Sequence, residues 1–262
     1  MTPKIHFWQW PNLLALDAAL IAVLWQAALA SALGAPLAMP GYIVLGLSVW
    51  LTYVADRLFD VASRPEASLL SLRHQFAKRY AQSLWVIWGG VLAINLLVAA
   101  QLSATQLKRG ALLLALCLFY TLLNQKLSRR FFPKELCVAL IYAGGVAVFL
   151  PTVPLGFVAC FAWLCLLNCL IIGSKEQSID AKLQVHSLAP LVAERGLGIL
   201  TLVSALIILW IDGACSRPLA LSCALLGGLH FLRGKLVIEN FRVLADGLLL
   251  AAPLLYLLAS RL

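Results

Sequence analysis

The sequence predicts an all-α, polytopic membrane protein with about nine transmembrane helices in a single bundle around a central cavity. Of the 262 residues, 63% are hydrophobic and only 12% are charged, whereas soluble domains are usually about 45–50% apolar and about 25% charged. The apolar residues gather in runs of the length that a membrane-spanning helix needs. No ten-residue alternating pattern recurs, as a membrane barrel would require. Residues 1–262 are therefore expected to form one transmembrane helical domain.

Charged residues, prolines and glycines separate nine apolar runs along the chain. They lie at about 12–33, 41–56, 81–102, 109–124, 135–151, 155–173, 196–212, 218–233 and 243–260. Several runs have only about 16 residues, so those helices are expected to use flanking residues or to tilt little.

The basic residues predict which loops face the cytoplasm. The chain has 20 lysines and arginines and a net charge of +9. With the N-terminus inside and nine spans, only Lys108, Arg109, Arg217 and Arg261 fall on the outer side. Cytoplasmic loops are enriched in Lys and Arg, so this orientation is strongly favoured. An even number of spans would destroy the segregation.

Two pairs of carboxylates follow the second and sixth runs. Asp56 and Asp60 form one pair, and Glu176 and Asp180 form the other. Each pair is spaced i and i+4, so its members share a helix face if the helix continues that far. Like charges one turn apart repel unless a cation joins them. Mg²⁺ prefers oxygen ligands and commonly binds substrate phosphates, so the pattern indicates a Mg²⁺–diphosphate site.

Basic and aromatic residues near these pairs suit the same interpretation. Arginine and lysine are the usual partners of phosphate, and apolar helices beneath the carboxylates could hold a lipid tail. The basic candidates are Arg57, Arg73, Lys78, Arg79, Lys134 and Lys175. Ring faces can stabilise a developing carbocation, and the candidate rings are Trp50, Tyr53, Tyr120, Tyr142 and Trp163.

The segment Thr52-Tyr-Val-Ala-Asp56-Arg57-Leu-Phe-Asp60 resembles the first aspartate-rich motif of the UbiA superfamily of intramembrane prenyltransferases, Asn-Asp-x-x-Asp-x-x-x-Asp. Glu176-x-x-x-Asp180 is similar to the end of that family's second motif. Nine spans, with acidic motifs after the second and the sixth, also match the plan of the family. The resemblance covers nearly the whole chain in architecture, and in residues it rests on these two segments.

The resemblance implies Mg²⁺-dependent transfer of a polyprenyl group from a prenyl diphosphate to an aromatic or other lipophilic acceptor. Asp56 and Asp60 would be catalytic, and Asp56, Asp60, Glu176 and Asp180 would hold the metal. The residues implied to bind substrate are Arg57, Arg73, Lys78, Arg79, Lys134, Asn168 and Lys175. The chain departs from the family at Thr52-Tyr53, where the motif has Asn-Asp. The earlier acid of the second motif falls near Asn168-Cys169, so Asn168 is expected to replace a lost ligand and metal affinity is expected to be lower.

Simpler interpretations of the same residues stay open. Asp56 and Asp60 could form salt bridges with Arg57 and Arg64, Glu176 and Asp180 could lie in a solvated loop, and residues 73–79 could bind lipid headgroups. The alternative function is a non-catalytic membrane protein, either a small-molecule transporter or a lipid-binding subunit. In its favour are Asp17 and Asp246, because charged groups at membrane depth are commonly functional, although an Arg242–Asp246 pair could be structural.

The composition also limits partners and location. The expected partners are membrane lipids, a prenyl diphosphate and its acceptor; nucleic acid is not expected, because the chain has no soluble basic face. The seven scattered cysteines are interpreted as small buried hydrophobic residues. The expected location is the cytoplasmic (inner) membrane of a bacterium, with the acidic motifs inside, and the sequence leaves the oligomeric state open.

Overall fold

A computed structural model describes residues 5–62, 71–127, 133–152, 154–182, 188, 194–211 and 213–260. Within these ranges, the side chains of residues 124–127, 178–182, 194 and 195 lie outside the description. The described part is all-helical, which confirms the predicted fold class.

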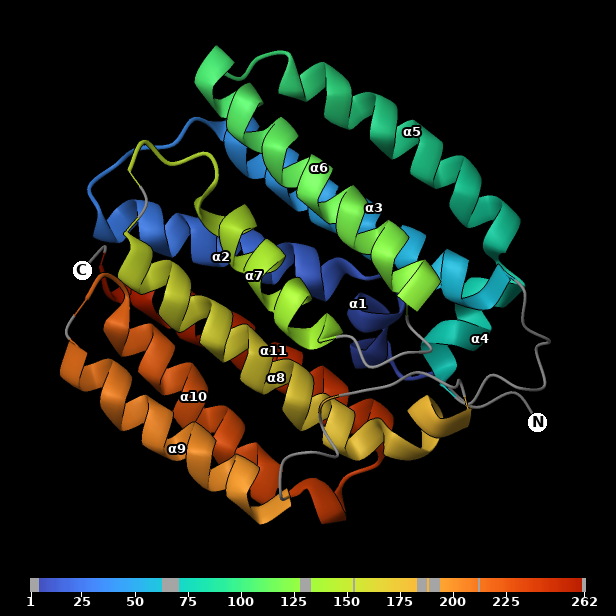
Figure 1. Cartoon of the computed structure of the whole chain (residues 1–262), viewed down its shortest axis with the longest axis vertical. Coiled ribbons are helices and arrows are strands. Elements are labelled where there is room, and N and C mark those ends of the chain that lie inside the picture. Colours follow the sequence, from blue (N-terminus) through green and yellow to red (C-terminus); the bar gives the residue numbers. More distant parts are fainter. Residues whose placement is uncertain are drawn as a thin grey trace.

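The long helices run roughly along one common direction, and the short helices α1 and α4 lie together at one end of the bundle (Figure 1). In chain order the helices are η1 (Phe7–Gln9), α1 (Trp10–Leu13), α2 (Leu16–Ala32), α3 (Met39–Ala62), α4 (Leu72–Arg79), α5 (Ala81–Ala99), α6 (Ala104–Leu127), α7 (Lys134–Ala147), α8 (Leu155–Lys182), α9 (Glu194–Ile211), α10 (Ser216–Phe231), η4 (Arg233–Lys235) and α11 (Ile238–Ala259).

Each of the nine apolar runs corresponds to one of the helices α2, α3 and α5 to α11. Five helices are long and apolar enough to cross a membrane, namely α3, α5, α6, α8 and α11. The bent pair Phe7–Leu13 and Leu16–Ala32 would add a sixth span. The helices therefore lie where the sequence predicts them, and the number that crosses the bilayer stays a prediction.

The helices pack against one another around a continuous hydrophobic core. Helix α2 packs against α3, α7 and α11, while α8 joins α7 to α9, α10 and α11. Trp25 of α2 is fully buried and lies against Phe157 and Phe161 of α8. At the edge, α5 and α6 have few buried residues, and none is buried in the described stretch 104–123 of α6. Such apolar but uncovered faces are what lipid-facing helices present.

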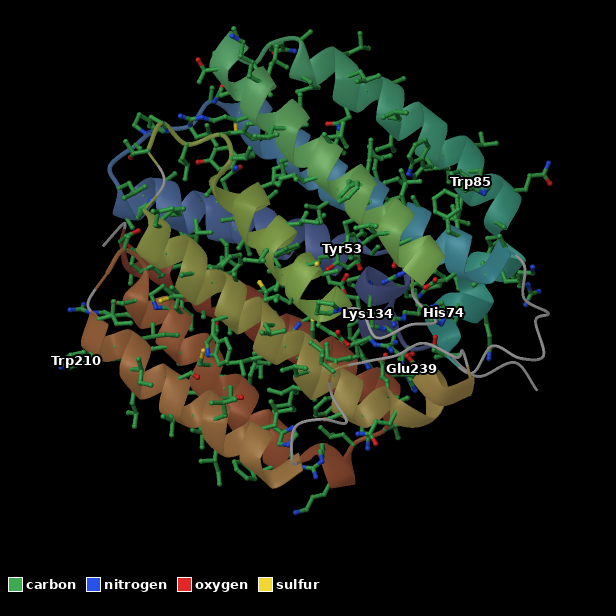
Figure 2. All side chains as sticks on the ribbon, in the orientation of Figure 1. Tyr53, His74, Trp85, Lys134, Trp210 and Glu239 are labelled. Atoms are coloured by element: carbon green, nitrogen blue, oxygen red, sulfur yellow. The ribbon has the colours of Figure 1, made fainter. Side chains whose placement is uncertain are left out.

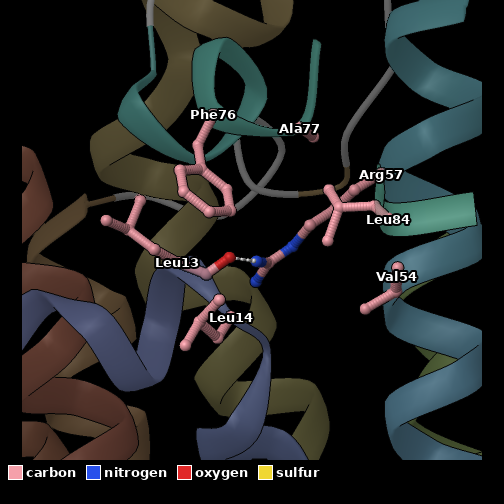
Figure 3. A pocket seen from close by; sticks show the side chains of 7 residues that line it. All are labelled: Leu13, Leu14, Val54, Arg57, Phe76, Ala77 and Leu84. Carbon is pink, nitrogen blue, oxygen red and sulfur yellow. Dashed lines mark hydrogen bonds between the residues drawn. The ribbon is translucent and has the colours of Figure 1, made fainter. Parts of the chain in front are cut away.

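The first apolar run is not one straight helix. Helix α1 and helix α2 meet at an angle of 78°, and Ala15 at the break adopts a left-handed backbone with φ of 56°. The break frees carbonyl groups that a continuous helix would use, and such groups need partners inside a membrane. Arg57 Nη1 donates to the carbonyls of Asn12 and Leu13 at 2.7 and 2.9 Å, as Figure 3 shows for Leu13. Trp50 Nε1 of α3 donates to Leu14 O at 2.8 Å.

A proline in α11 frees one more backbone carbonyl, in the core of the bundle. Pro253 has no N–H to donate, so Leu249 O loses its usual partner within the helix. Trp25 Nε1 donates to this oxygen at 3.1 Å. The bond joins α2 to α11, two helices that lie side by side and come from opposite ends of the chain.

Replacing Trp25 with Phe should therefore destabilise the protein, because Leu249 O loses the indole donor and the smaller ring leaves space in the core. We expect a loss of at least about 1 kcal/mol, the scale of one buried hydrogen bond in protein or membrane. Thermal unfolding in detergent would measure it. Trp210→Phe is the control, because Trp210 is 88% exposed, and an equal loss in both variants would contradict the role given to Trp25.

Candidate functional site

Both acidic pairs lie on continuous helices. Helix α3 runs to Ala62, so Asp56 and Asp60 are one turn apart on the same face, and α8 runs to Lys182, so Glu176 and Asp180 are too. The side chain of Asp180 lies outside the described residues, and its predicted role as a ligand stays a prediction.

Asp56 is surrounded by positive charge from three helices. Arg73 of α4, Arg57 of α3 and Lys134 of α7 all lie within electrostatic reach of its carboxylate. Tyr120 of α6 also lies within reach of Asp56. The Asp56 side chain is nevertheless exposed, so the surrounding charges leave it accessible to a ligand. An accessible carboxylate among cations is the arrangement that a metal-bound phosphate group would need.

Arg73 also connects α4 to the second acidic segment. Its Nη2 lies 3.4 Å from Glu176 Oε2. Glu176 pairs with Arg242 of α11 as well, and Arg242 Nη1 lies 3.6 Å from Glu239 Oε2. Glu239 Oε1 in turn accepts a hydrogen bond of 3.0 Å from the backbone N–H of Leu72 at the start of α4. Ion pairs and a hydrogen bond thus fasten α4 to α8 and α11.

Asp60 lies near a buried histidine. His74 Nε2 is 3.8 Å from Asp60 Oδ2, and His74 Nδ1 is 2.8 Å from Ser71 Oγ. The Asp60 side chain is 38% exposed while that of His74 is 6% exposed. Asp60 is therefore held at the junction of α3 and α4 with part of its carboxylate accessible. In Figure 2, His74, Lys134 and Glu239 lie toward the end where α1 and α4 lie, and Trp210 lies at the other end.

Several predicted substrate-binding residues make contacts elsewhere. Lys78 Nζ donates to Val61 O and Ala62 O, the last carbonyls of α3, at 2.9 and 3.2 Å. Lys175 Nζ donates to Arg233 O at 2.7 Å. The Arg79 guanidinium lies 5.8 Å from the centre of the Tyr80 ring. Besides its helix contacts, Arg57 borders a pocket of about 10 Å³, which has room for about one water molecule (Figure 3).

Asn168, the predicted replacement ligand, has a side-chain oxygen that is free to bind. Its Oδ1 is buried and has no hydrogen-bond partner among the described residues. Cys169, the next residue, lies within electrostatic reach of Lys134 and Asp246. Phe161, about two turns before Asn168, lies against Tyr142 of α7, so Asn168 is on the face of α8 that meets α7.

A second acidic group lies at the broken first helix. The Asn12 side-chain amide donates to Asp17 Oδ2 at 2.6 Å and to Asp246 Oδ2 at 3.1 Å. The two carboxyl groups also lie within electrostatic reach of each other. Asp246 therefore bonds to Asn12, while Arg242, its expected partner one turn earlier, pairs with Glu176 and Glu239.

Three of the aromatic candidates lie near one or the other acidic group, and Trp163 does not. Tyr53 and Tyr142 lie within reach of Asp17 and Asp246, and Tyr142 OH donates to Ala18 O at 2.6 Å. Tyr120 lies near Asp56, as described above. Trp163 Nε1 instead donates to Ser204 Oγ at 2.9 Å, between α8 and α9.

The first acidic pair suits the binding of one Mg²⁺ ion. Asp56 and Asp60 offer two accessible carboxylates, and Mg²⁺ usually keeps several waters and needs only one or two carboxylates. Glu176 is shared by two arginines. No three His, Cys, Asp or Glu side chains of the described part lie close enough to share a metal ion. A single ion at the end of α3 is therefore the arrangement that the described side chains suit.

Some residues of this cluster escaped prediction from the sequence. Glu239, Asn12 and His74 contact residues that lie up to 234 positions away in the sequence. No local sequence pattern predicts such contacts. Only Asn12 could have been suspected from the sequence. It begins an apolar run that also contains Asp17, and polar side chains in a membrane-spanning segment need polar partners.

The fold resembles that of a known protein. A UbiA homolog from Aeropyrum pernix K1, solved in its apo form, matches over 92% of this chain and 98% of its own, with a TM-score of 0.59 and 16% sequence identity. No family model and no curated protein matches the amino-acid sequence. At this identity the likeness shows a common fold, and it agrees with the UbiA resemblance of the aspartate-rich segment.

The Asp17–Asp246 pair gives a prediction about polar satisfaction. Asp246→Asn keeps an oxygen that can accept the second hydrogen bond of the Asn12 amide, whereas Asp246→Leu removes this acceptor and leaves Asn12 bonded only to Asp17 among the described residues. We expect Asp246→Asn to change the free energy of unfolding little and Asp246→Leu to lower it by about 1–3 kcal/mol. Thermal unfolding of both variants in detergent checks this, and equal stability of the two would show that the bonds to Asp246 contribute nothing.

Proposed function

We propose that this protein is an intramembrane prenyltransferase of the UbiA type, which transfers a polyprenyl group from a prenyl diphosphate to a lipophilic acceptor. One observation carries the proposal: an accessible carboxylate, Asp56, lies among Arg73, Arg57 and Lys134, and Arg73 also pairs with Glu176 of the second acidic segment. The fold shared with a UbiA homolog supports it.

The proposed roles follow from what each side chain contacts. Arg73 and Lys134 would bind diphosphate oxygens, because both cations lie within electrostatic reach of Asp56. Glu176 would position Arg73 rather than act alone. Arg57 would contribute positive charge while it holds the carbonyls of the broken helix.

Asp56 and Asp60 would hold Mg²⁺. The ion would neutralise the diphosphate and so help it leave as the allylic C–O bond breaks. The ring of Tyr120, near Asp56, would stabilise positive charge on the prenyl group. The prenyl tail would lie among the apolar helices, and the acceptor would attack the allylic carbon from there.

The second candidate is a small-molecule transporter, and the broken first helix favours it. Transporters often bind ions at half-helix ends near mid-membrane, and Asp17 follows such a break. The carbonyls that the break exposes are, however, already bonded to Arg57 and Trp50. A site whose carbonyls are occupied in this way offers little to an ion, so we place this function second.

Asp56→Asn should lower the Mg²⁺-dependent turnover of a prenyl diphosphate by about 10²-fold or more, the scale on which one electrostatic contact to a transition state acts. The assay is product formation from a radiolabelled prenyl diphosphate and aromatic acceptors by purified protein in bilayers. The control is Asp212→Asn, because the charge pattern places Asp212 on the opposite side of the membrane.

Full turnover by wild-type protein in excess chelator would contradict the metal-dependent mechanism. Solute uptake into proteoliposomes without any product from a prenyl diphosphate would favour the transporter instead.

A further inference from the structure

Near the candidate site, two buried side-chain oxygens have no hydrogen-bond partner in the part of the chain that the structure describes. They are Glu135 Oε2 and Asn168 Oδ1. Glu135 is only 6% exposed. Buried polar atoms in native proteins are nearly always hydrogen-bonded, so each exception needs a reason. A ligand that supplies the missing donor is one such reason.

Glu135 is held by one oxygen and leaves the other free. It lies in the first turn of α7, and its Oε1 accepts a hydrogen bond of 3.1 Å from the backbone N–H of Leu188. That contact fixes the carboxylate in place. Asn168 lies on α8, which packs along α7. Carboxylate and amide oxygens both accept hydrogen bonds. A ligand that satisfies Glu135 Oε2 and Asn168 Oδ1 must therefore donate a hydrogen bond.

These oxygens lie beside the group around Asp56. Glu135 lies seven residues before Tyr142 on α7, and Asn168 lies seven residues after Phe161 on α8. The ring centres of Tyr142 and Phe161 are 6.1 Å apart. Because α7 and α8 run antiparallel (Figure 1), the same step of about two turns along each helix brings Glu135 and Asn168 to one level. Glu135 is also within electrostatic reach of Cys169 and Tyr120. Tyr120 is in turn within reach of Asp56. Helices α6, α7 and α8 therefore bring Tyr120, Glu135 and Asn168 to one region that adjoins the proposed diphosphate site.

We propose that Glu135 and Asn168 bind the polar head of the acceptor, and that this head carries a hydrogen-bond donor, a hydroxyl or amino group on a lipophilic body. The inference rests on the proposed function, because it assigns the site to the acceptor of prenyl transfer. A second Mg²⁺ ion suits the two atoms poorly, since Asn168 is neutral and Glu135 has one free oxygen, whereas Mg²⁺ demands near-octahedral oxygen coordination. An acceptor whose only polar group is an ether has no hydrogen to donate, so it would leave Glu135 Oε2 and Asn168 Oδ1 without a hydrogen bond.

Binding of 1-naphthol and of 1-methoxynaphthalene to the purified full chain in nanodiscs tests this inference. The two probes differ mainly in the O–H donor. Wild-type protein should bind 1-naphthol at least about tenfold more tightly, the effect expected of one hydrogen bond to a charged group. Glu135→Gln keeps an acceptor for the Leu188 N–H but replaces the free oxygen with a donor, so the preference should shrink to about threefold or less.

Two further variants keep the test decisive. Asn168→Ala should also reduce the preference for 1-naphthol over 1-methoxynaphthalene. This variant replaces Glu135→Gln in the test if Glu135→Gln fails to fold. Ser222→Ala is the matched control: Ser222 Oγ is likewise buried and unpartnered among the described residues, but it lies on α10, so its removal should leave the preference unchanged.

Equal binding of the two probes by wild-type protein would overturn the inference, because a water molecule would then suffice to satisfy these oxygens. An unchanged preference in both Glu135→Gln and Asn168→Ala would overturn it as well. The measurement contains no prenyl diphosphate, so its result does not depend on turnover. A preserved probe preference in a chain without transferase activity would leave this site as a lipophile-binding site and reject only the proposed function.

Discussion

The site depends above all on the position of one guanidinium, that of Arg73. It pairs with Glu176 of α8 at 3.4 Å and lies within electrostatic reach of Asp56 of α3. Two acidic segments that are far apart in the sequence therefore meet the same cation. Buried carboxylates are stable only when paired or otherwise satisfied, and Glu176 has two such partners, Arg73 and Arg242. Helix α4, which carries Arg73, therefore helps to stabilise the cluster and is also a candidate binding element.

The broken first helix imposes the second constraint. Carbonyl groups inside a membrane must be hydrogen-bonded within the protein, and the break at Ala15 would leave several without partners. Arg57 and Trp50 of α3 satisfy them. The same break positions the Asn12 amide to bond to both Asp17 and Asp246, so the geometry around the site depends on α1, α3 and α11 together.

The sequence predicted the long helices because each is an apolar run that burial or lipid can cover. It missed α1 and α4, which are too short or too polar to stand out by hydropathy: α4 reads Leu-Arg-His-Gln-Phe-Ala-Lys-Arg. The aspartate-rich segment was recognisable because its acidic residues lie close together in the sequence with i, i+4 spacing. The structure keeps both on one continuous helix, α3. The carbonyls that Lys78 and Lys175 contact lie 16 to 58 residues away in the chain, and no local pattern could reveal them.

The central claim is that Asp56 and Glu176 act on one ligand through a shared Arg73, and a double-mutant cycle tests it most directly. Binding of inorganic pyrophosphate with Mg²⁺ would be measured by calorimetry for wild-type protein, Asp56→Asn, Glu176→Gln and the double variant. A shared site predicts that the two losses of binding free energy are coupled by about 0.5 kcal/mol or more. Losses that add within about 0.3 kcal/mol, or no binding of pyrophosphate by the wild type, would contradict it.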